Sequence, residues 1–272
     1  MTVAEVLALA RQMGVDRLDA QLLLGNALGR PRSWLLAHDD AAISEPAWAG
    51  LNDSLRRRAA DEPLAYLLGE KEFRGLSFKV TPAVLIPRPA TETLVEWALE
   101  LLAPLPPSAQ PELLDMGTGS GAIALSIKHA CPRARVTALD LSEPALDVAR
   151  DNGQRLSLAI EWLQSDWWGA VEGRRFDLIL ANPPYVAEGD PHLPALAHEP
   201  RGALTSGSDG LDALRVLVAG AADHLRPSAW LLLEHGYDQS EAVGALLRGA
   251  GFAAVEQRRD LAGQPRCSGG RR

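Results

Sequence analysis

The chain has 272 residues, of which 47% are hydrophobic and 23% charged, which is typical of a globular protein with one large domain or a core domain and a smaller partner. Its formal net charge of −8 disfavours a protein that holds duplex nucleic acid by the phosphates, and its two cysteines argue against a disulfide framework. No apolar run approaches the ~18 residues of a membrane span and the six histidines are scattered, so we expect a cytoplasmic protein without a membrane anchor or a bound metal.

The first 72 residues are predicted to form a small all-helical domain. Thr2 and Glu5 have the spacing of a capping box, and Asp16 can cap a second helix that ends near Gly29. Pro63 suits the first turn of a last short helix. No catalytic constellation is visible in this region. It is therefore either a stabilising appendage or a domain that recognises a partner, and the pattern alone does not choose between them.

Residues 73–88 change to a strand pattern and predict a β-hairpin that links two domains. Apolar side chains alternate with polar ones at Leu76, Phe78 and Val80, and glycine and proline residues supply the turns. After a helix and a proline-rich connection, strand and helix patterns alternate to the end of the chain in the manner of a doubly wound sheet. Residues 89–272 are therefore predicted to form one α/β domain.

A glycine-rich loop follows the short predicted strand at residues 113–115. It consists of Gly117, Thr118, Gly119, Ser120 and Gly121. Glycine allows a close approach of the backbone to a ligand. Asp140 ends the next predicted strand, 140 − 117 = 23 positions after the first glycine, where a carboxylate can hold both hydroxyls of a ribose. The loop reads Gly-x-Gly-x-Gly and has no third glycine at the offset found in the Gly-x-Gly-x-x-Gly loops that bind dinucleotides. It therefore favours a nucleoside with an amino-acid tail, such as S-adenosylmethionine, over a cofactor with a pyrophosphate.

Two further strand ends carry candidate ligand-binding groups. Asp166 and Trp167 follow a strand predicted at residues 159–163, where a carboxylate and an indole can meet the amine and the face of an adenine. The apolar run 176–181 ends in Asn182-Pro183-Pro184-Tyr185, whose carbonyl groups can accept both hydrogens of a planar –NH₂ group while the tyrosine ring offers a flat face. Taken singly, each is also compatible with an ordinary loop or a packed side chain, but all lie at one predicted sheet edge.

These motifs resemble those of the S-adenosylmethionine-dependent amino-methyltransferases. Three longer stretches are similar to the peptide chain release factor glutamine methyltransferases: EPLAYLLGEKEFRGLSFKVTPAVLIPRP at residues 62–89, EPRGALTSGSDGLDALR at 199–215 and LLEHGYDQ at 232–239. The resemblance implies a Rossmann-like, seven-stranded class I methyltransferase domain and a helical domain that helps to recognise the release factor. It also implies methyl transfer from S-adenosylmethionine to the side-chain amide nitrogen (N5) of the glutamine in a Gly-Gly-Gln motif, with S-adenosylhomocysteine as the product.

The same resemblance assigns the site residues. Those expected at the cofactor are Asp115, Gly117, Thr118, Gly119, Ser120, Gly121, Asp140, Asp166, Trp167 and Asn182. Those expected at the glutamine amide, as catalytic residues, are Asn182, Pro183, Pro184 and Tyr185. Neither a metal nor direct contact with nucleic acid is expected.

Two features depart from the family pattern. Ala90 stands where the family usually has an acidic residue, and the glycine-rich composition of residues 266–272 disfavours the last strand of the sheet. Three other functions stay open on the residues alone: methylation of a glutamine in a ribosomal protein, methylation of an exocyclic base amine in nucleic acid, and a non-catalytic cofactor-binding interaction module.

Overall fold

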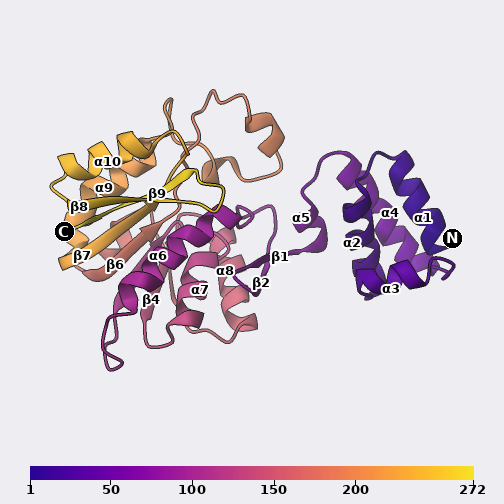
Figure 1. The fold of residues 1–272 in the computed structure, drawn as a ribbon, viewed down its shortest axis with the longest axis horizontal. Helices are drawn as coiled ribbons and strands as arrows, with labels where there is room; N and C mark the ends of the chain where they lie inside the picture. Colours follow the sequence, from indigo (N-terminus) through magenta and orange to yellow (C-terminus); the bar gives the residue numbers. More distant parts are fainter. The chain divides into compact units, whose positions relative to one another are not determined.

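The computed structural model describes residues 1–272 and divides into two compact units, Met1–Glu70 and Lys71–Arg272 (Figure 1). The boundary lies two residues before the predicted one at residue 72. No helix in either unit has the length and apolar character that a membrane crossing requires.

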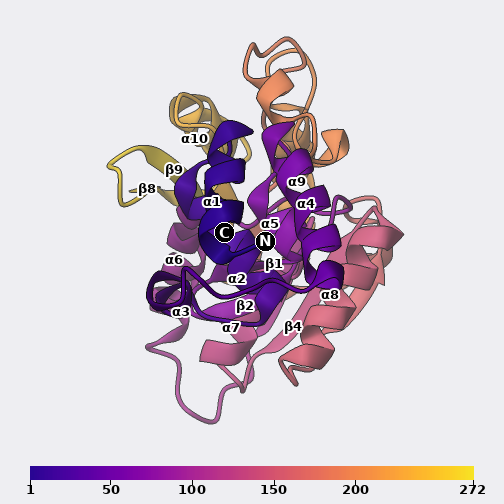
Figure 2. The same cartoon turned by 90° about the vertical axis from the view of Figure 1, so that its right-hand side faces the viewer.

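The first unit is a bundle of short helices (Figure 2). They are α1 (Val3–Gln12), α2 (Arg17–Leu28), α3 (Arg32–Ala37), α4 (Glu45–Ala59) and α5 (Leu64–Leu68). The predicted capping box at Thr2 and Glu5 is present, and Asp16 accepts a hydrogen bond from the Leu18 amide at the start of α2. Gly29 ends α2 in the left-handed conformation that glycine favours. The apolar faces of α1, α2 and α4 enclose the core of this unit.

The predicted hairpin exists but is shorter and begins earlier than residues 73–88. It pairs β1 (Glu70–Phe73) with β2 (Leu76–Lys79) through a tight turn in which Arg74 and Gly75 both have positive φ. Residues 80–88 form no strand, although Val84 and Ile86 are buried there. The physical reason is that the prolines in this segment have no backbone N–H to donate in a hydrogen bond to a neighbouring strand. The segment therefore forms a turn, and its apolar side chains are buried from there.

The second unit is built on a seven-stranded sheet with the order β5-β4-β3-β6-β7-β9-β8, which confirms the predicted fold class. Its strands are β3 (Glu112–Met116), β4 (Arg135–Asp140), β5 (Glu161–Gln164), β6 (Phe176–Ala181), β7 (Leu225–Glu234), β8 (Ala253–Arg259) and β9 (Pro265–Arg271). The first five are parallel, and β9 runs antiparallel to both of its neighbours. The third predicted strand, 159–163, is shifted to β5: pairing with β4 begins at Glu161, Ile160 before it packs against the core, and Ala159 is exposed.

Helices cover both faces of this sheet (Figure 1). They are α6 (Glu92–Leu102), α7 (Ala122–Ala130), α8 (Glu143–Arg155), α9 (Asp212–His224) and α10 (Ser240–Gly249), with short 3₁₀ turns η1 (Pro89–Thr91), η2 (Gly169–Val171), η3 (Leu193–Leu196) and η4 (Arg201–Ala203). Successive strand residues point to opposite faces, so Leu113 packs in the core with α6 and α7, whereas Leu114 packs in the core with α9 and α10. A sheet buried on both faces explains the continuous apolar runs of its strands.

The last strand forms despite its composition, and its glycines are the reason it fits. A Cβ atom on Gly269 would lie 2.7 Å from Cη2 of Trp97 on α6 and 2.6 Å from Cδ2 of Leu232 on β7. On the other face, a Cβ atom on Gly270 would lie 2.7 Å from Cβ of Phe252. Strand β9 is thus an interior strand whose neighbours leave no room for side chains at these positions.

Replacing Gly269 by alanine is expected to lower the free energy of unfolding by about 1–3 kcal/mol, because the added methyl group overpacks the contact between β9, α6 and β7. Urea denaturation of the full chain measures this change. Gly189→Ala is the matched control, since a Cβ atom there meets nothing within 4 Å. Equal denaturation midpoints for the two variants would contradict the packing argument.

Candidate functional site

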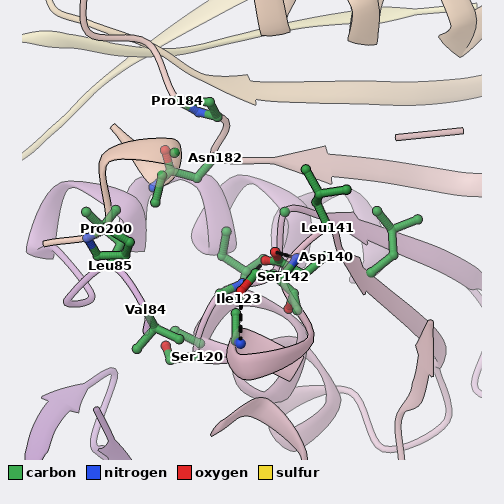
Figure 3. A pocket seen from close by; sticks show the side chains of 18 of the residues that line it. Val84, Leu85, Ser120, Ile123, Asp140, Leu141, Ser142, Asn182, Pro184 and Pro200 are labelled. Atoms are coloured by element: carbon green, nitrogen blue, oxygen red, sulfur yellow. Dashed lines mark hydrogen bonds between the residues drawn. The ribbon is translucent and has the colours of Figure 1, made fainter. Parts of the chain in front are cut away.

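A cavity of about 370 Å³ lies at the carboxyl ends of β3, β4, β5 and β6 in the second unit (Figure 3). The predicted site residues that line it are Gly117, Thr118, Gly119, Ser120, Asp140, Asp166, Trp167, Asn182 and Pro184. Asp115, Gly121, Pro183 and Tyr185 do not line it. The structure therefore brings most of the predicted residues together at one sheet edge, as expected for parallel strands.

The glycine loop reaches the cavity because it is held against the end of β4. The amides of Gly117 and Thr118 both donate to the carbonyl oxygen of Leu139, each at 2.9 Å. Gly117 and Gly119 have positive φ and face open space where a Cβ atom would stand, so their backbone is accessible to a ligand. Gly121 serves packing instead, because a Cβ atom there would lie 3.0 Å from Leu125 and 3.2 Å from Trp162.

Asp140 lies on the cavity wall with its carboxylate held by backbone amides (Figure 3). Its Oδ2 accepts a hydrogen bond from the Gly119 amide and its Oδ1 from the Ser142 amide, both at 2.9 Å. Burial raises the pKa of this carboxyl group, and the amide hydrogen bonds oppose the rise. A carboxylate oxygen has more than one acceptor position, so both oxygens can still receive hydroxyl groups of a ligand.

Asp115 lies beneath the glycine loop rather than on the cavity wall. Its Oδ2 accepts hydrogen bonds from the Thr118 hydroxyl at 2.6 Å and from the Ala124 amide at 3.2 Å, which joins the loop to the first turn of α7. The side chain is buried, its Oδ1 has no hydrogen-bond partner, and burial raises the pKa of the carboxyl group to about 7. Its contacts support the loop that lines the cavity.

The raised pKa of Asp115 predicts a specific pH dependence of stability. The folded chain keeps the proton up to about pH 7, whereas the unfolded chain releases it near pH 4, so this group destabilises the fold progressively as pH rises through that interval. In Asp115→Asn the contribution is absent. We expect the free energy of unfolding, measured by urea denaturation without cofactor, to fall in the wild type relative to this variant between pH 5 and 7. Parallel curves for the two proteins would contradict the prediction.

Asp166 and Trp167 both line the cavity after β5. Asp166 is exposed, whereas Trp167 is half-buried and packs on the core that faces α9 and α10. Trp167 has a positive φ of 47°, an unusual conformation for a residue with a bulky side chain, and its carbonyl oxygen accepts a hydrogen bond from the Ser165 hydroxyl at 2.9 Å. The strained turn fixes the direction in which the indole leaves the backbone.

Asn182 presents an unpaired acceptor at the end of β6. Its Nδ2 donates to the hydroxyl oxygen of Thr91 at 3.3 Å, whereas its Oδ1 is buried without any hydrogen-bond partner. Figure 3 shows Asn182 and Pro184 on the cavity wall across from Asp140. A buried amide oxygen without a partner is costly unless a ligand supplies the donor.

Tyr185 turns away from the cavity. Its hydroxyl donates to Oε1 of Glu234 at 3.3 Å, and its carbonyl oxygen accepts a hydrogen bond from Nε2 of Gln239 at 2.9 Å. Burial, together with the charge of Glu234, raises the pKa of the phenol well above its usual value. The tyrosine thus connects the end of β6 to the end of β7, and its ring is not among the residues that face the cavity.

Further cavity residues were not anticipated from the sequence. Leu141 follows Asp140 and is 66% exposed on the cavity wall, and Leu85 and Arg88 come from the segment before α6. Arg88 pairs with the buried carboxylate of Glu199, which also accepts a hydrogen bond from the Ile86 amide at 3.1 Å. This ion pair joins segments 111 residues apart in the sequence. The only feature of the sequence that pointed to Arg88 and Glu199 was that each lies within a stretch that resembles the methyltransferase family.

Comparison with known proteins identifies relatives of both units. The family model described as "Methyltransferase small domain" matches residues 97–233, and "PrmC N-terminal domain" matches residues 4–69. The release factor glutamine methyltransferase of Bordetella pertussis is 51% identical over 94% of this chain and 95% of its own length, and that of Burkholderia pseudomallei is 50% identical over 99% and 96%. The solved Thermus thermophilus 16S rRNA N2 G1207 methyltransferase, in complex with AdoMet and guanosine, shares the fold with a TM-score of 0.55 at 22% identity, covering 75% of this chain and 49% of that one.

Proposed function

The chain belongs to the family of release factor glutamine methyltransferases, and from this premise we propose that its cavity holds S-adenosylmethionine next to the side-chain amide of the glutamine in a release factor's Gly-Gly-Gln motif. The enzyme is a methyltransferase that uses S-adenosylmethionine. One observation carries the assignment of the amide site: Asn182 lines the cavity, and its buried Oδ1 has no hydrogen-bond partner. A glutamine –NH₂ group supplies the missing donor.

The residues around the cavity fit S-adenosylmethionine. Gly117 and Gly119 leave room for a ligand against the backbone, and the two oxygens of Asp140 can accept the two ribose hydroxyls. Leu141 and Trp167 offer apolar surface for the adenine. When bound, the cofactor supplies an activated methyl group on a sulfonium.

Asn182 would position the attacking nitrogen. An amide nitrogen is a weak nucleophile because its lone pair is delocalised into the carbonyl group. Oδ1 of Asn182 can accept one hydrogen of the –NH₂ group, which directs the nitrogen toward the methyl group and stabilises the positive charge that develops on it. Pro183, also expected at the amide, does not line the cavity. The new nitrogen–carbon bond forms as the carbon–sulfur bond breaks, the sulfur keeps the electron pair as S-adenosylhomocysteine, and the nitrogen then loses one proton to solvent.

We further propose that the helical unit, predicted as residues 1–72, takes part in recognition of the release factor. Two findings support this proposal. A family model of its own matches residues 4–69, and the unit has its own apolar core. The curated relatives do not favour the alternative functions, namely methylation of a ribosomal protein, methylation of a base amine, or a non-catalytic module.

The proposed function is tested by methyl transfer. The purified chain is incubated with methyl-labelled S-adenosylmethionine and a release factor, and mass spectrometry locates the label. Label is expected on the glutamine of the Gly-Gly-Gln motif, and none is expected on a release factor in which that glutamine is replaced. Label that persists after the replacement, or that appears only on added ribosomal protein or RNA, would overturn the substrate assignment.

A further inference from the structure

Two consecutive tryptophans in the turn after β5 have different surroundings. Trp167 lines the cavity, whereas Trp168 does not line it and packs instead against α9 (Figure 1). Both side chains are half-buried. Because the peptide unit that joins the two residues is planar and rigid, a contact that fixes Trp168 also restricts the backbone of Trp167. The surroundings of Trp168 therefore bear on a residue of the cavity wall.

Three residues on one face of α9 form a slot for the Trp168 indole. Val216, Gly220 and His224 follow one another at intervals of four positions, so they lie one above the other on the helix. The indole Nε1 donates to the carbonyl oxygen of Val216 at 3.2 Å, and the indole stacks on the His224 ring with centroids 4.6 Å apart and an interplanar angle of 5°. Nδ1 of His224 donates to the carbonyl oxygen of Arg174 at 3.1 Å, which fixes the imidazole on which the indole lies.

Gly220 leaves the space that this slot requires. A Cβ atom on Gly220 would lie 2.3 Å from Nε1 and 2.6 Å from Cδ1 of Trp168, far inside van der Waals contact. The indole is a rigid ring, so a methyl group at this position displaces the ring or the helix. Glycine lowers the stability of a helix interior relative to alanine, and the room for the indole is a physical reason for its presence here.

The turn that carries both tryptophans has an unfavourable backbone conformation. Trp167 has a φ of 47°, which is costly for a bulky residue and persists only where the surrounding structure holds it. The Ser165 hydroxyl donates to the carbonyl oxygen of Trp167 and accepts from the Ala170 amide, both at 2.9 Å. These hydrogen bonds connect the turn to itself. The contacts of Trp168 with α9 connect it to the body of the domain.

We propose that the slot on α9, formed by Val216, Gly220 and His224, positions the Trp167 indole for contact with the adenine of S-adenosylmethionine by holding Trp168. Trp168 and Gly220 are positioning residues, since neither lines the cavity. This inference rests on the proposed function, because it concerns the same cofactor site. It goes further by assigning a share of the cofactor affinity to residues outside the cavity.

The test uses Gly220→Ala, which fills the slot, in the wild-type chain and together with Trp167→Ala. Calorimetric titration measures the Kd of two ligands. S-adenosylhomocysteine carries the adenine, whereas S-ribosylhomocysteine has the same ribose and amino-acid tail but no base. The matched control is Gly50→Ala, since Gly50 lies within α4, is exposed, and a Cβ atom there meets nothing within 4 Å.

Gly220→Ala is expected to raise the Kd for S-adenosylhomocysteine about fivefold or more, because a base stacked on an aromatic side chain loses about that much affinity when the stack is removed. The Kd for S-ribosylhomocysteine should stay at the wild-type value. Trp167→Ala should show the same pattern, and Gly220→Ala should cause no further loss in its presence, because the indole through which the slot acts is then absent. Gly50→Ala should bind both ligands like the wild type.

Wild-type affinity of folded Gly220→Ala for S-adenosylhomocysteine would overturn the inference. So would an equal loss for S-ribosylhomocysteine, or a loss that persists in the Trp167→Ala chain, because the effect would then not pass through a contact between Trp167 and adenine. If thermal melting shows that Gly220→Ala is unfolded, Trp168→Ala, which empties the slot, replaces it in the same comparison with the same expected and contrary results. Absence of S-adenosylhomocysteine binding by the wild type would overturn the proposed function, and this inference with it.

Discussion

Asn182→Ala is expected to turn over about 10²–10³-fold more slowly than the wild type, with little change in the Kd for S-adenosylmethionine. The alanine removes the acceptor that we place against the attacking nitrogen, whereas the contacts proposed for the cofactor at the glycine loop and at Asp140 stay in place. Single-turnover methylation of a release factor measures the chemical step, and calorimetric titration measures cofactor affinity.

The control for this variant is Asn26→Ala, which removes an exposed asparagine from α2 in the helical unit. It should retain wild-type turnover. Normal turnover by Asn182→Ala would show that this side chain does not position the amide. A loss of cofactor affinity as large as the loss of turnover would place Asn182 at the cofactor rather than at the substrate.

Asp140→Ala is expected to weaken S-adenosylmethionine binding about 10²-fold. Two hydrogen bonds from ribose hydroxyls to a charged carboxylate, at about 1.5 kcal/mol or more each, correspond to that factor. Calorimetric titration of the full chain measures it. Asp223→Ala, which removes an exposed aspartate from α9, should bind the cofactor like the wild type.

A second measurement separates ribose binding from support of the loop, because Asp140 also accepts hydrogen bonds from Gly119 and Ser142. S-adenosylhomocysteine lacking the ribose hydroxyls should bind the wild type much more weakly than the normal product. Asp140→Ala should not distinguish the two compounds. Discrimination that persists in the variant would assign the ribose hydroxyls to another residue.

The sequence determined the parts of this protein that depend on residues close together in the chain. The glycine loop after β3, Asp140 at the end of β4 and Asn182 at the end of β6 follow directly from apolar runs and turn residues, and parallel strands bring their carboxyl ends to one edge. The capping box of α1 is likewise local. The family resemblance rested on contiguous stretches, and the 51% identity with a curated relative agrees with it.

Only the tertiary structure decided which predicted residues face the cavity and what holds them there. Tyr185 was expected at the substrate but turns to Glu234, 49 residues away, and the free acceptor of Asn182 exists because its other end meets Thr91, 91 residues away. Strand β9 contradicts its own composition because Trp97 and Phe252 fill the space beside its glycines. The physical reason is common to these cases. Local sequence patterns indicate backbone preference and burial. The hydrogen-bond partner of a buried polar group, and the side chains that surround a glycine, depend instead on which distant segments pack against them.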